Sequence, residues 1–173
     1  MKVLLIAAIT ADGKIAETTD QRSLDWTSKE DLKFFIEKTK EAGVVIMGRK
    51  TYETFGKPLK GRRLIVMSSK GDDGLMDKVD ELEAGVVEYS RLDIKQMISK
   101  LEAQGYDQVV VAGGASVYGQ FLEQELVTDV YLNVHSILFG AGVPLATGFE
   151  RVQMKLEDVS RLGEQEVLLH YTV

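Results

Sequence analysis

The sequence predicts an α/β fold in which a mainly parallel, twisted sheet lies between helices on both faces. Three apolar runs, at residues 2–9, 44–47 and 108–112, have the continuous hydrophobic character of strands buried on both sides. Amphipathic segments alternate with these runs, as is typical of parallel sheets. The tail, at about residues 150–173, alternates in polarity on both sides of a turn at 161–164, which predicts an antiparallel hairpin at the sheet edge.

The size and charge of the chain restrict its class. Its 173 residues fit a single domain, 1–173, and 45% hydrophobic residues suffice for a full core. With a net charge of −6 and no basic stripe, we expect no nucleic acid as a main partner. The absence of cysteine excludes disulfides and thiolate chemistry, and the short apolar N-terminus cannot span a bilayer. We therefore expect a cytoplasmic protein with no membrane partner.

Local signals predict the individual elements. Strands are expected at residues 2–9, 44–47, 64–67, 85–89, 108–112 and 127–138, and helices at about 28–42, 48–55, 94–104 and 115–122. Segments rich in glycine and polar residues are expected to be turns or loops, namely 11–14, 15–25, 68–83 and 139–144.

Caps and apolar stripes locate the two longest helices. The first has Thr27 and Glu30 as a capping box, with Ser28 and Asp31 as the alternative pair. The second opens with a similar box from Ser90 to Asp93, and the two helices end at Gly43 and Gly105. The stripes expected to face the core are Leu32, Phe35, Ile36 and Thr39 in the first helix and Ile94, Met97, Ile98 and Leu101 in the second.

Two strand-to-helix turns favour an anionic ligand. Gly48-Arg49-Lys50-Thr51 and Gly113-Gly114 each follow a buried strand and open a helix. Free N–H groups at a helix start and neighbouring cations suit phosphate, and ligands bind at this end of the strands in open α/β sheets. Each turn alone also fits an ordinary helix start whose cations face water. Two such turns in one sheet favour a dinucleotide.

The helical period places Asp31 beside the apolar stripe of the first helix. It lies about 40° from Phe35 on the wheel, at the border of the stripe. Such a carboxylate can hold an amino-bearing heterocycle, although it can also simply stabilise the helix dipole. The two histidines, His135 and His170, lie far apart in apolar strands, so no metal site or catalytic triad is expected.

Several blocks of the sequence occur in the same order in a known family. They are Ile6-Ala7-Ala8, Asp12-Gly13-Lys14-Ile15, Trp26, Asp31-Leu32, Phe35, Met47-Gly48-Arg49-Lys50-Thr51-Tyr52-Glu53, Gly56-Lys57-Pro58-Leu59, Gly61-Arg62, Met67-Ser68-Ser69 and Gly113-Gly114-Ala115-Ser116-Val117-Tyr118. With these blocks the chain resembles the dihydrofolate reductase family. The resemblance implies the three-layer α/β/α fold of that family and hydride transfer from NADPH to a folate pterin ring.

The resemblance also implies the roles of individual residues. Asp31 would hold the pterin ring and help its protonation, and Arg62 would pair with the carboxylate of the folate tail. The other implied substrate-binding residues are Ile6, Leu32, Phe35, Thr51 and Asn133. The implied NADPH-binding residues are Ala8, Ile15, Ala16, Gly48, Arg49, Lys50, Thr51, Ser68, Ser69, Gly113, Gly114, Ala115, Ser116, Val117 and Tyr118. No metal is implied.

The chain departs from this family pattern in part of the sequence. Asn133 stands where a threonine is usual, which we expect to weaken the hydrogen bond behind Asp31. The segments Ala11–Ala16 and His135–Leu145 resemble the related pyrimidine reductase domain of riboflavin biosynthesis, whose substrate carries a ribose phosphate. That activity is the alternative interpretation, and a nucleotide-binding protein without turnover is a third. The chain is expected to be a monomer or a homodimer.

Overall fold

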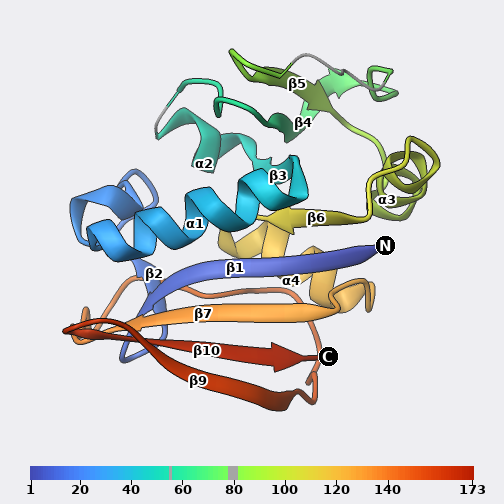
Figure 1. Cartoon of the computed structure of the whole chain (residues 1–173). Coiled ribbons are helices and arrows are strands. Elements are labelled where there is room, and N and C mark those ends of the chain that lie inside the picture. Colours follow the sequence, from blue (N-terminus) through green and yellow to red (C-terminus); the bar gives the residue numbers. More distant parts are fainter. Residues whose placement is uncertain (55, 78–81) are drawn as a thin grey trace.

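The computed structural model describes residues 1–54, 56–77 and 82–173. An eight-stranded sheet has the strand order β5-β4-β3-β6-β1-β7-β10-β9 (Figure 1). Neighbouring strands from β5 to β7 are parallel, whereas β10 is antiparallel to both β7 and β9. The prediction of a mainly parallel sheet that ends in an antiparallel hairpin is therefore confirmed.

The bounds of the elements follow. The strands are β1 (Lys2–Thr10), β2 (Lys14–Ala16), β3 (Val44–Gly48), β4 (Arg63–Asp72), β5 (Val86–Ser90), β6 (Gln108–Val111), β7 (Asp129–His135), β8 (Val143–Pro144), β9 (Lys155–Gly163) and β10 (Glu166–Thr172). The helices are the short 3-10 helix η1 (Ser23–Asp25), α1 (Lys29–Ala42), α2 (Arg49–Glu53), α3 (Ile94–Ala103) and α4 (Ala115–Glu123).

The helices cover both faces of the sheet, as predicted. Along β1, alternate side chains point to opposite faces. Leu4 and Ile6 pack in a cluster with Phe34, Phe35 and Ala42 of α1. The odd-numbered residues of β1 belong to the largest core cluster, together with apolar side chains of α3 and α4. The three-layer α/β/α arrangement is visible in Figure 1, where α1 crosses in front of the sheet.

The structure corrects two of the predicted caps. Ser28 is the N-cap of α1, and its side chain accepts a hydrogen bond from the backbone N–H of Asp31 at 2.9 Å. The alternative pair was therefore right, and the box of Thr27 and Glu30 was wrong. Asp93 caps α3, because Ser90 is still the last residue of β5. Gly43 ends α1 in the left-handed conformation, as expected.

Loop boundaries differ more from the prediction. β4 continues to Asp72, so Ser68 and Ser69 lie in a strand and not in a loop, because Asp72 pairs again with β5. Part of the loop predicted at 15–25 is regular, since β2 pairs with β8 and residues 23–25 form η1. β7 ends at His135, before the predicted 138, and the carboxylate of Asp12 accepts hydrogen bonds from the N–H groups of Phe139 and Gly140 beyond it.

Phe55, at the end of one predicted helix, and residues 78–81 of the predicted loop lie outside the described residues. Within the described ranges, no helix combines the length and apolar character needed to cross a membrane.

Candidate active site

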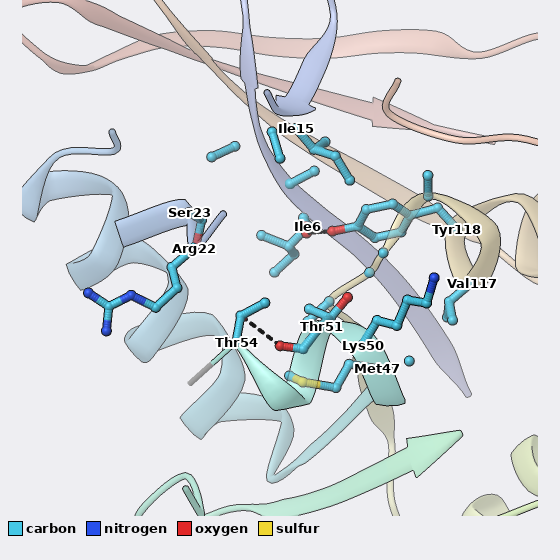
Figure 2. A pocket seen from close by; sticks show the side chains of 18 of the residues that line it. Ile6, Ile15, Arg22, Ser23, Met47, Lys50, Thr51, Thr54, Val117 and Tyr118 are labelled. Carbon is cyan, nitrogen blue, oxygen red and sulfur yellow. Dashed lines mark hydrogen bonds between the residues drawn. The ribbon is translucent and has the colours of Figure 1, made fainter. Parts of the chain in front are cut away.

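A cavity of about 1100 Å³ opens at the carboxyl ends of the central parallel strands (Figure 2). Its lining includes Ala8 near the end of β1, Gly48 at the end of β3 and Gly113 just beyond β6, together with Met67 of β4, which pairs with Gly48. The opposite walls come from α1, from residues 18–24 and from residues 57–60. The cavity therefore occupies the position where open α/β sheets bind ligands.

The two glycine turns form one continuous part of this lining. The backbone N–H of Gly48 donates to the carbonyl of Gly113 at 2.7 Å. A Cβ atom on Gly114 would lie 3.0 Å from the hydroxyl oxygen of Thr51, and one on Gly48 would lie 3.1 Å from Val117. Gly113 has a φ of 96°, which favours glycine. The glycines thus let the two turns pack together, and α4 begins at their edge with N–H groups that have no partner within the helix.

Charge is distributed unequally around the cavity. Asp31 is the only carboxylate among the described lining residues. The six cationic lining residues are Arg22, Arg49, Lys50, Lys57, Lys60 and Arg62. Two of these are already paired with acids outside the lining, Arg22 with Asp25 and Arg49 with Glu53. A cavity with this excess of positive charge suits a ligand that carries several negative charges.

Arg62 is the most enclosed of the cations, with 6% of its surface exposed. Its Nε donates to the carbonyl of Lys60 at 3.0 Å, and its Nη1 donates to the hydroxyl of Thr39 on α1 at 2.8 Å. Among the described residues, no hydrogen bond involves Nη2. Burial lowers the pKa of Arg62 from its ordinary value, but arginine stays protonated in proteins. The side chain is thus held in one orientation with a donor left for an anion.

Helix α1 contributes both a charge and an apolar wall. Leu32, Phe35 and Ile36 were predicted to face the core, but they are half-buried and line the cavity, and only Thr39 of that stripe is fully buried. Asp31 lies beside them at the cavity. Burial raises the pKa of Asp31, and the charge of Glu166 adds to this effect, whereas a hydrogen bond from Asn133 and the charge of His135 oppose it.

Asn133 lies behind Asp31 on β7. Its Nδ2 donates to Oδ1 of Asp31 at 2.8 Å and to Oε2 of Glu166 on β10, also at 2.8 Å. The expectation that asparagine would weaken the hydrogen bond behind Asp31 was wrong, because the longer amide side chain reaches the carboxylate directly. Sequence reasoning missed Glu166, since it follows the turn of a hairpin far along the chain from Asp31.

Most of the predicted site residues do line this one cavity. These are Ile6, Ala8, Ile15, Ala16, Asp31, Leu32, Phe35, Gly48, Arg49, Lys50, Thr51, Arg62, Gly113, Gly114, Ala115, Ser116, Val117 and Tyr118. Tyr118 is also structural, because its hydroxyl donates to the carbonyl of Ile6 at 2.6 Å (Figure 2). Asn133, Ser68 and Ser69 are not among the lining residues. Ser69 is exposed on β4, beyond Met67, which does line the cavity.

Sequence reasoning missed a second group of lining residues. They are Ala7, Thr18, Thr19, Gln21, Arg22, Ser23, Leu24, Ile36, Met47, Thr54, Lys57, Pro58, Leu59, Lys60, Met67, Ala112, Gln120, Val143, Pro144 and Thr147. One signal could have found residues 18–24, because they connect Ile15 and Ala16 to Asp31, and these three residues were already predicted for the site. Nothing local marks Thr147 or Val143, which reach the cavity only through the fold.

Comparison with known proteins gives the family. The sequence pattern of the family described as dihydrofolate reductase matches residues 2–139. The dihydrofolate reductase of Neisseria meningitidis serogroup B is 31% identical over 175 residues, covering 99% of this chain and 98% of that protein.

Two solved structures show the fold. One is a diaminohydroxyphosphoribosylaminopyrimidine deaminase/5-amino-6-(5-phosphoribosylamino)uracil reductase from Thermotoga maritima, with a TM-score of 0.77 at 22% identity, covering 99% of this chain and 56% of that chain. The other is a dihydrofolate reductase from Enterococcus faecalis complexed with NADP(H), with a TM-score of 0.67 at 22% identity, covering 99% and 95%. The family match and the near-complete alignment with the Neisseria enzyme decide the assignment: the chain belongs to the dihydrofolate reductase family.

Proposed function

We propose that the protein reduces 7,8-dihydrofolate to tetrahydrofolate with NADPH as the hydride donor. The observation that carries the proposal is the charge pattern of the cavity, in which Asp31 is the single carboxylate among the described lining residues and Arg62 is a fixed, enclosed cation. A folate presents an amino-bearing ring at one end and carboxylates at the other, so it matches both groups. The likeness to the Neisseria dihydrofolate reductase over 99% of the chain supports the same activity.

The described residues fit NADPH. The cofactor would supply the hydride, and its phosphates need cations and free backbone donors near a turn. Arg49 and Lys50 are exposed at the cavity beside Thr51 and could pair with phosphates, while residues 113–118 would meet the middle of the cofactor. Ala8, Ile15 and Ala16 would border the nicotinamide, since small and apolar side chains exclude water there. Ser68 and Ser69 are proposed only for the adenosine end, beyond Met67.

The substrate side would be formed mainly by α1. Ile6, Leu32 and Phe35 would contact the pterin and benzoyl rings, and Thr51 lies where the two ligands would meet. Asp31 would accept hydrogen bonds from the amino group and ring N–H of the pterin and so orient it. The ring nitrogen beside the reduced carbon would take its proton from water, with Asp31 favouring that protonation. Orientation and electrostatics are then the contribution of this chain to the rate.

A pyrimidine reductase of riboflavin biosynthesis is the second candidate. It is favoured by the TM-score of 0.77 to the Thermotoga reductase, which exceeds the 0.67 to the Enterococcus dihydrofolate reductase. Its phosphate-bearing substrate could use Lys57 and Lys60, which are exposed at the cavity. At 22% identity this likeness supports the fold and not the substrate, so dihydrofolate remains the first proposal. In either case we propose a cytoplasmic enzyme that acts as a monomer or homodimer.

One assay separates the two candidates. NADPH absorbance is followed with dihydrofolate and, in parallel, with 5-amino-6-(5-phosphoribosylamino)uracil. Turnover with dihydrofolate alone supports the proposal, and turnover with the pyrimidine alone overturns it. Arg62→Gln should raise the KM for dihydrofolate about 10-fold or more, because a charge-assisted hydrogen bond contributes about 1.5–3 kcal/mol. Lys95→Gln on α3, outside the cavity lining, is the matched control and should leave KM unchanged.

A further inference from the structure

Two carboxylates share one amide behind the cavity. Asn133 is 2% exposed, and its Nδ2 lies 2.8 Å from Oδ1 of Asp31 and 2.8 Å from Oε2 of Glu166. Glu166 is 5% exposed and comes from β10, on the side of β7 opposite β1. The charge at the cavity is therefore connected through one side chain to a second, fully buried acid.

The orientation of this amide is fixed by its neighbours. An asparagine amide has two N–H donors, and both are directed at carboxylate oxygens here. The opposite orientation would direct Oδ1 of Asn133 at the same oxygens. Among the described residues, this Oδ1 is buried without a hydrogen-bond partner. The amide thus holds Asp31 and Glu166 together at the expense of its own acceptor.

His135 completes the group on the same strand as Asn133. Its Nε2 lies 3.3 Å from Oε2 of Glu166 and 3.2 Å from Nδ2 of Asn133. Because both hydrogens of the amide are directed at the acids, a proton on Nε2 has Glu166 as its acceptor. The ring of Trp26 packs edge-on against His135, with 5.1 Å between the ring centres, and helps to separate this pair from water. His135 and Glu166 therefore form a buried pair behind Asp31.

The groups that face Asp31 come from four elements. They are Asn133 and His135 on β7, Glu166 on β10, Thr27 just before α1, and Tyr118 on α4. Tyr118 stays neutral, since burial and the charge of Asp31 both raise its pKa. Among the described residues, no cation forms an ion pair with Asp31 within 4.0 Å. Burial raises the pKa of Asp31, and the opposing charges of His135 and Glu166 then act on it from behind.

We propose that Asn133, Glu166 and His135 are positioning residues that hold the Asp31 carboxylate toward the cavity and control, through the charges of Glu166 and His135, how readily it takes up a proton. The link to catalysis rests on the proposed function, in which Asp31 meets the pterin ring. The effect of Glu166 and His135 on proton uptake by Asp31 does not depend on the identity of the substrate.

The test is a carbon-13 NMR titration of the protein labelled at aspartate carboxyl carbons, without substrate. Asp31→Asn assigns the signal. Glu166→Gln removes a negative charge and should move the midpoint of Asp31 to lower pH by about one unit, as expected for a charge a few ångströms away at a partly shielded site. His135→Gln keeps a donor toward Glu166 but removes the positive charge, so it should move the midpoint upward. The double variant should return close to the original midpoint.

His170→Gln is the matched control. His170 also lies in a strand beside an acid, 2.9 Å from Asp129, but on β10 away from Asp31. It should leave the Asp31 midpoint unchanged. The proposal would be overturned if the Asp31 midpoint moved in the same direction in Glu166→Gln and His135→Gln, or if it did not move. If Glu166→Gln does not fold, the upward shift in His135→Gln remains decisive.

The pH profile of kcat/KM for NADPH-dependent reduction connects the titration to catalysis. Its acidic midpoint should follow the NMR midpoint in each variant, which a merely structural role would not produce. A different result is that the two variants shift the NMR midpoint of Asp31 as expected, downward in Glu166→Gln and upward in His135→Gln, while the protein shows no turnover with dihydrofolate. That result would overturn the proposed function and leave this inference standing.

Discussion

Two buried charged clusters of this protein differ in how completely their charges are paired. In the first, Arg63 donates from Nε to Glu88, from Nη1 to Gln104 at 2.6 Å and from Nη2 to the carbonyl of Met76 at 2.6 Å. Glu88 also accepts from the N–H of Met76 at 2.8 Å. In the second, Asn133 donates to both Asp31 and Glu166 while its own oxygen has no partner among the described residues.

The difference separates a structural cluster from one that faces a ligand. Burial alone would lower the pKa of Arg63, but the hydrogen bond and charge of Glu88 raise it above the ordinary value. Burial likewise disfavours the charge of Asp31, but there the opposing contributions do not prevail and the pKa stays raised. A site acid that is incompletely paired in the protein can pair with a substrate.

The largest expected effect comes from breaking the paired cluster. Arg63→Met leaves Glu88 buried without its cation, which should cost about 3–5 kcal/mol of unfolding free energy. Urea unfolding followed by circular dichroism measures the loss. The double variant Arg63→Met/Glu88→Leu should regain most of it, because apolar residues can replace a buried ion pair. A loss below about 1 kcal/mol in the single variant would contradict the structural role.

Asp31→Asn should have the next largest effect, and this effect is on turnover. Loss of the carboxylate that favours protonation of the ring should lower kcat/KM for dihydrofolate by about 100-fold or more, in the range of general acid–base catalysis. The Kd for NADPH, measured by fluorescence titration, should change by less than about twofold. Glu30→Gln, which removes the neighbouring exposed acid of α1, is the control and should keep full activity.

The pH dependence of stability, compared between the original protein and Asp31→Asn, tests the raised pKa of Asp31. Because the pKa of Asp31 is raised in the folded state, the unfolded state loses this proton first as the pH rises. The free energy of unfolding therefore falls as the pH rises from the ordinary pKa of 3.8 to the raised pKa of the folded state. Asp31→Asn lacks this loss. Above the raised pKa it should therefore be more stable than the original protein, by about 1.4 kcal/mol for each pH unit between the folded and unfolded pKa of Asp31.

Urea unfolding at a series of pH values measures this difference. The unfolding free energies of the two proteins should converge at low pH, where Asp31 is neutral in both the folded and the unfolded state. A constant difference across the whole range would show that the substitution acts by packing and not by charge.

The smallest effect is expected at the rim of the paired cluster. Gln104→Leu removes the hydrogen bonds to Nη1 of Arg63 and to the carbonyl of Met76. Each of these two bonds contributes about 0.5–1.5 kcal/mol, and Arg63 keeps its other partners, so a loss of about 1–2 kcal/mol in urea unfolding is expected. Gln96→Leu, at an exposed position of α3, should change stability by less than about 0.5 kcal/mol. Equal losses in both variants would show that the effect is not specific to the cluster.

Local patterns in the sequence located the elements well. Continuous apolar runs identified β1, β3 and β6, because strands buried on both faces need apolar side chains at every position. Gly43 identified the end of α1, because few residues other than glycine adopt its φ of 73°. The caps were less certain, since several Ser, Thr, Asp and Glu residues near 27–31 offer equivalent pairs, and only the backbone geometry distinguishes Ser28 from Thr27.

The neighbours Arg62 and Arg63 show where sequence reasoning reached its limit. The two arginines are adjacent in the sequence, yet Arg62 faces the cavity, where Thr39 of α1 holds it, and Arg63 is fully buried against Glu88 of β5. Their partners lie 23 and 25 residues away, so no local pattern distinguishes the two arginines.

The sequence by itself therefore determined the layered α/β fold, the two glycine turns at the ends of strands and the presence of Asp31 beside an apolar stripe. Only the tertiary structure decided what lies behind Asp31. Glu166 meets Asn133 because β10 runs antiparallel to β7 after a hairpin turn, so that Glu166 pairs with His135 in the register of the sheet. That register depends on the packing of the whole edge of the sheet, and it brings together charges that lie 102 and 33 residues from Asn133 along the chain.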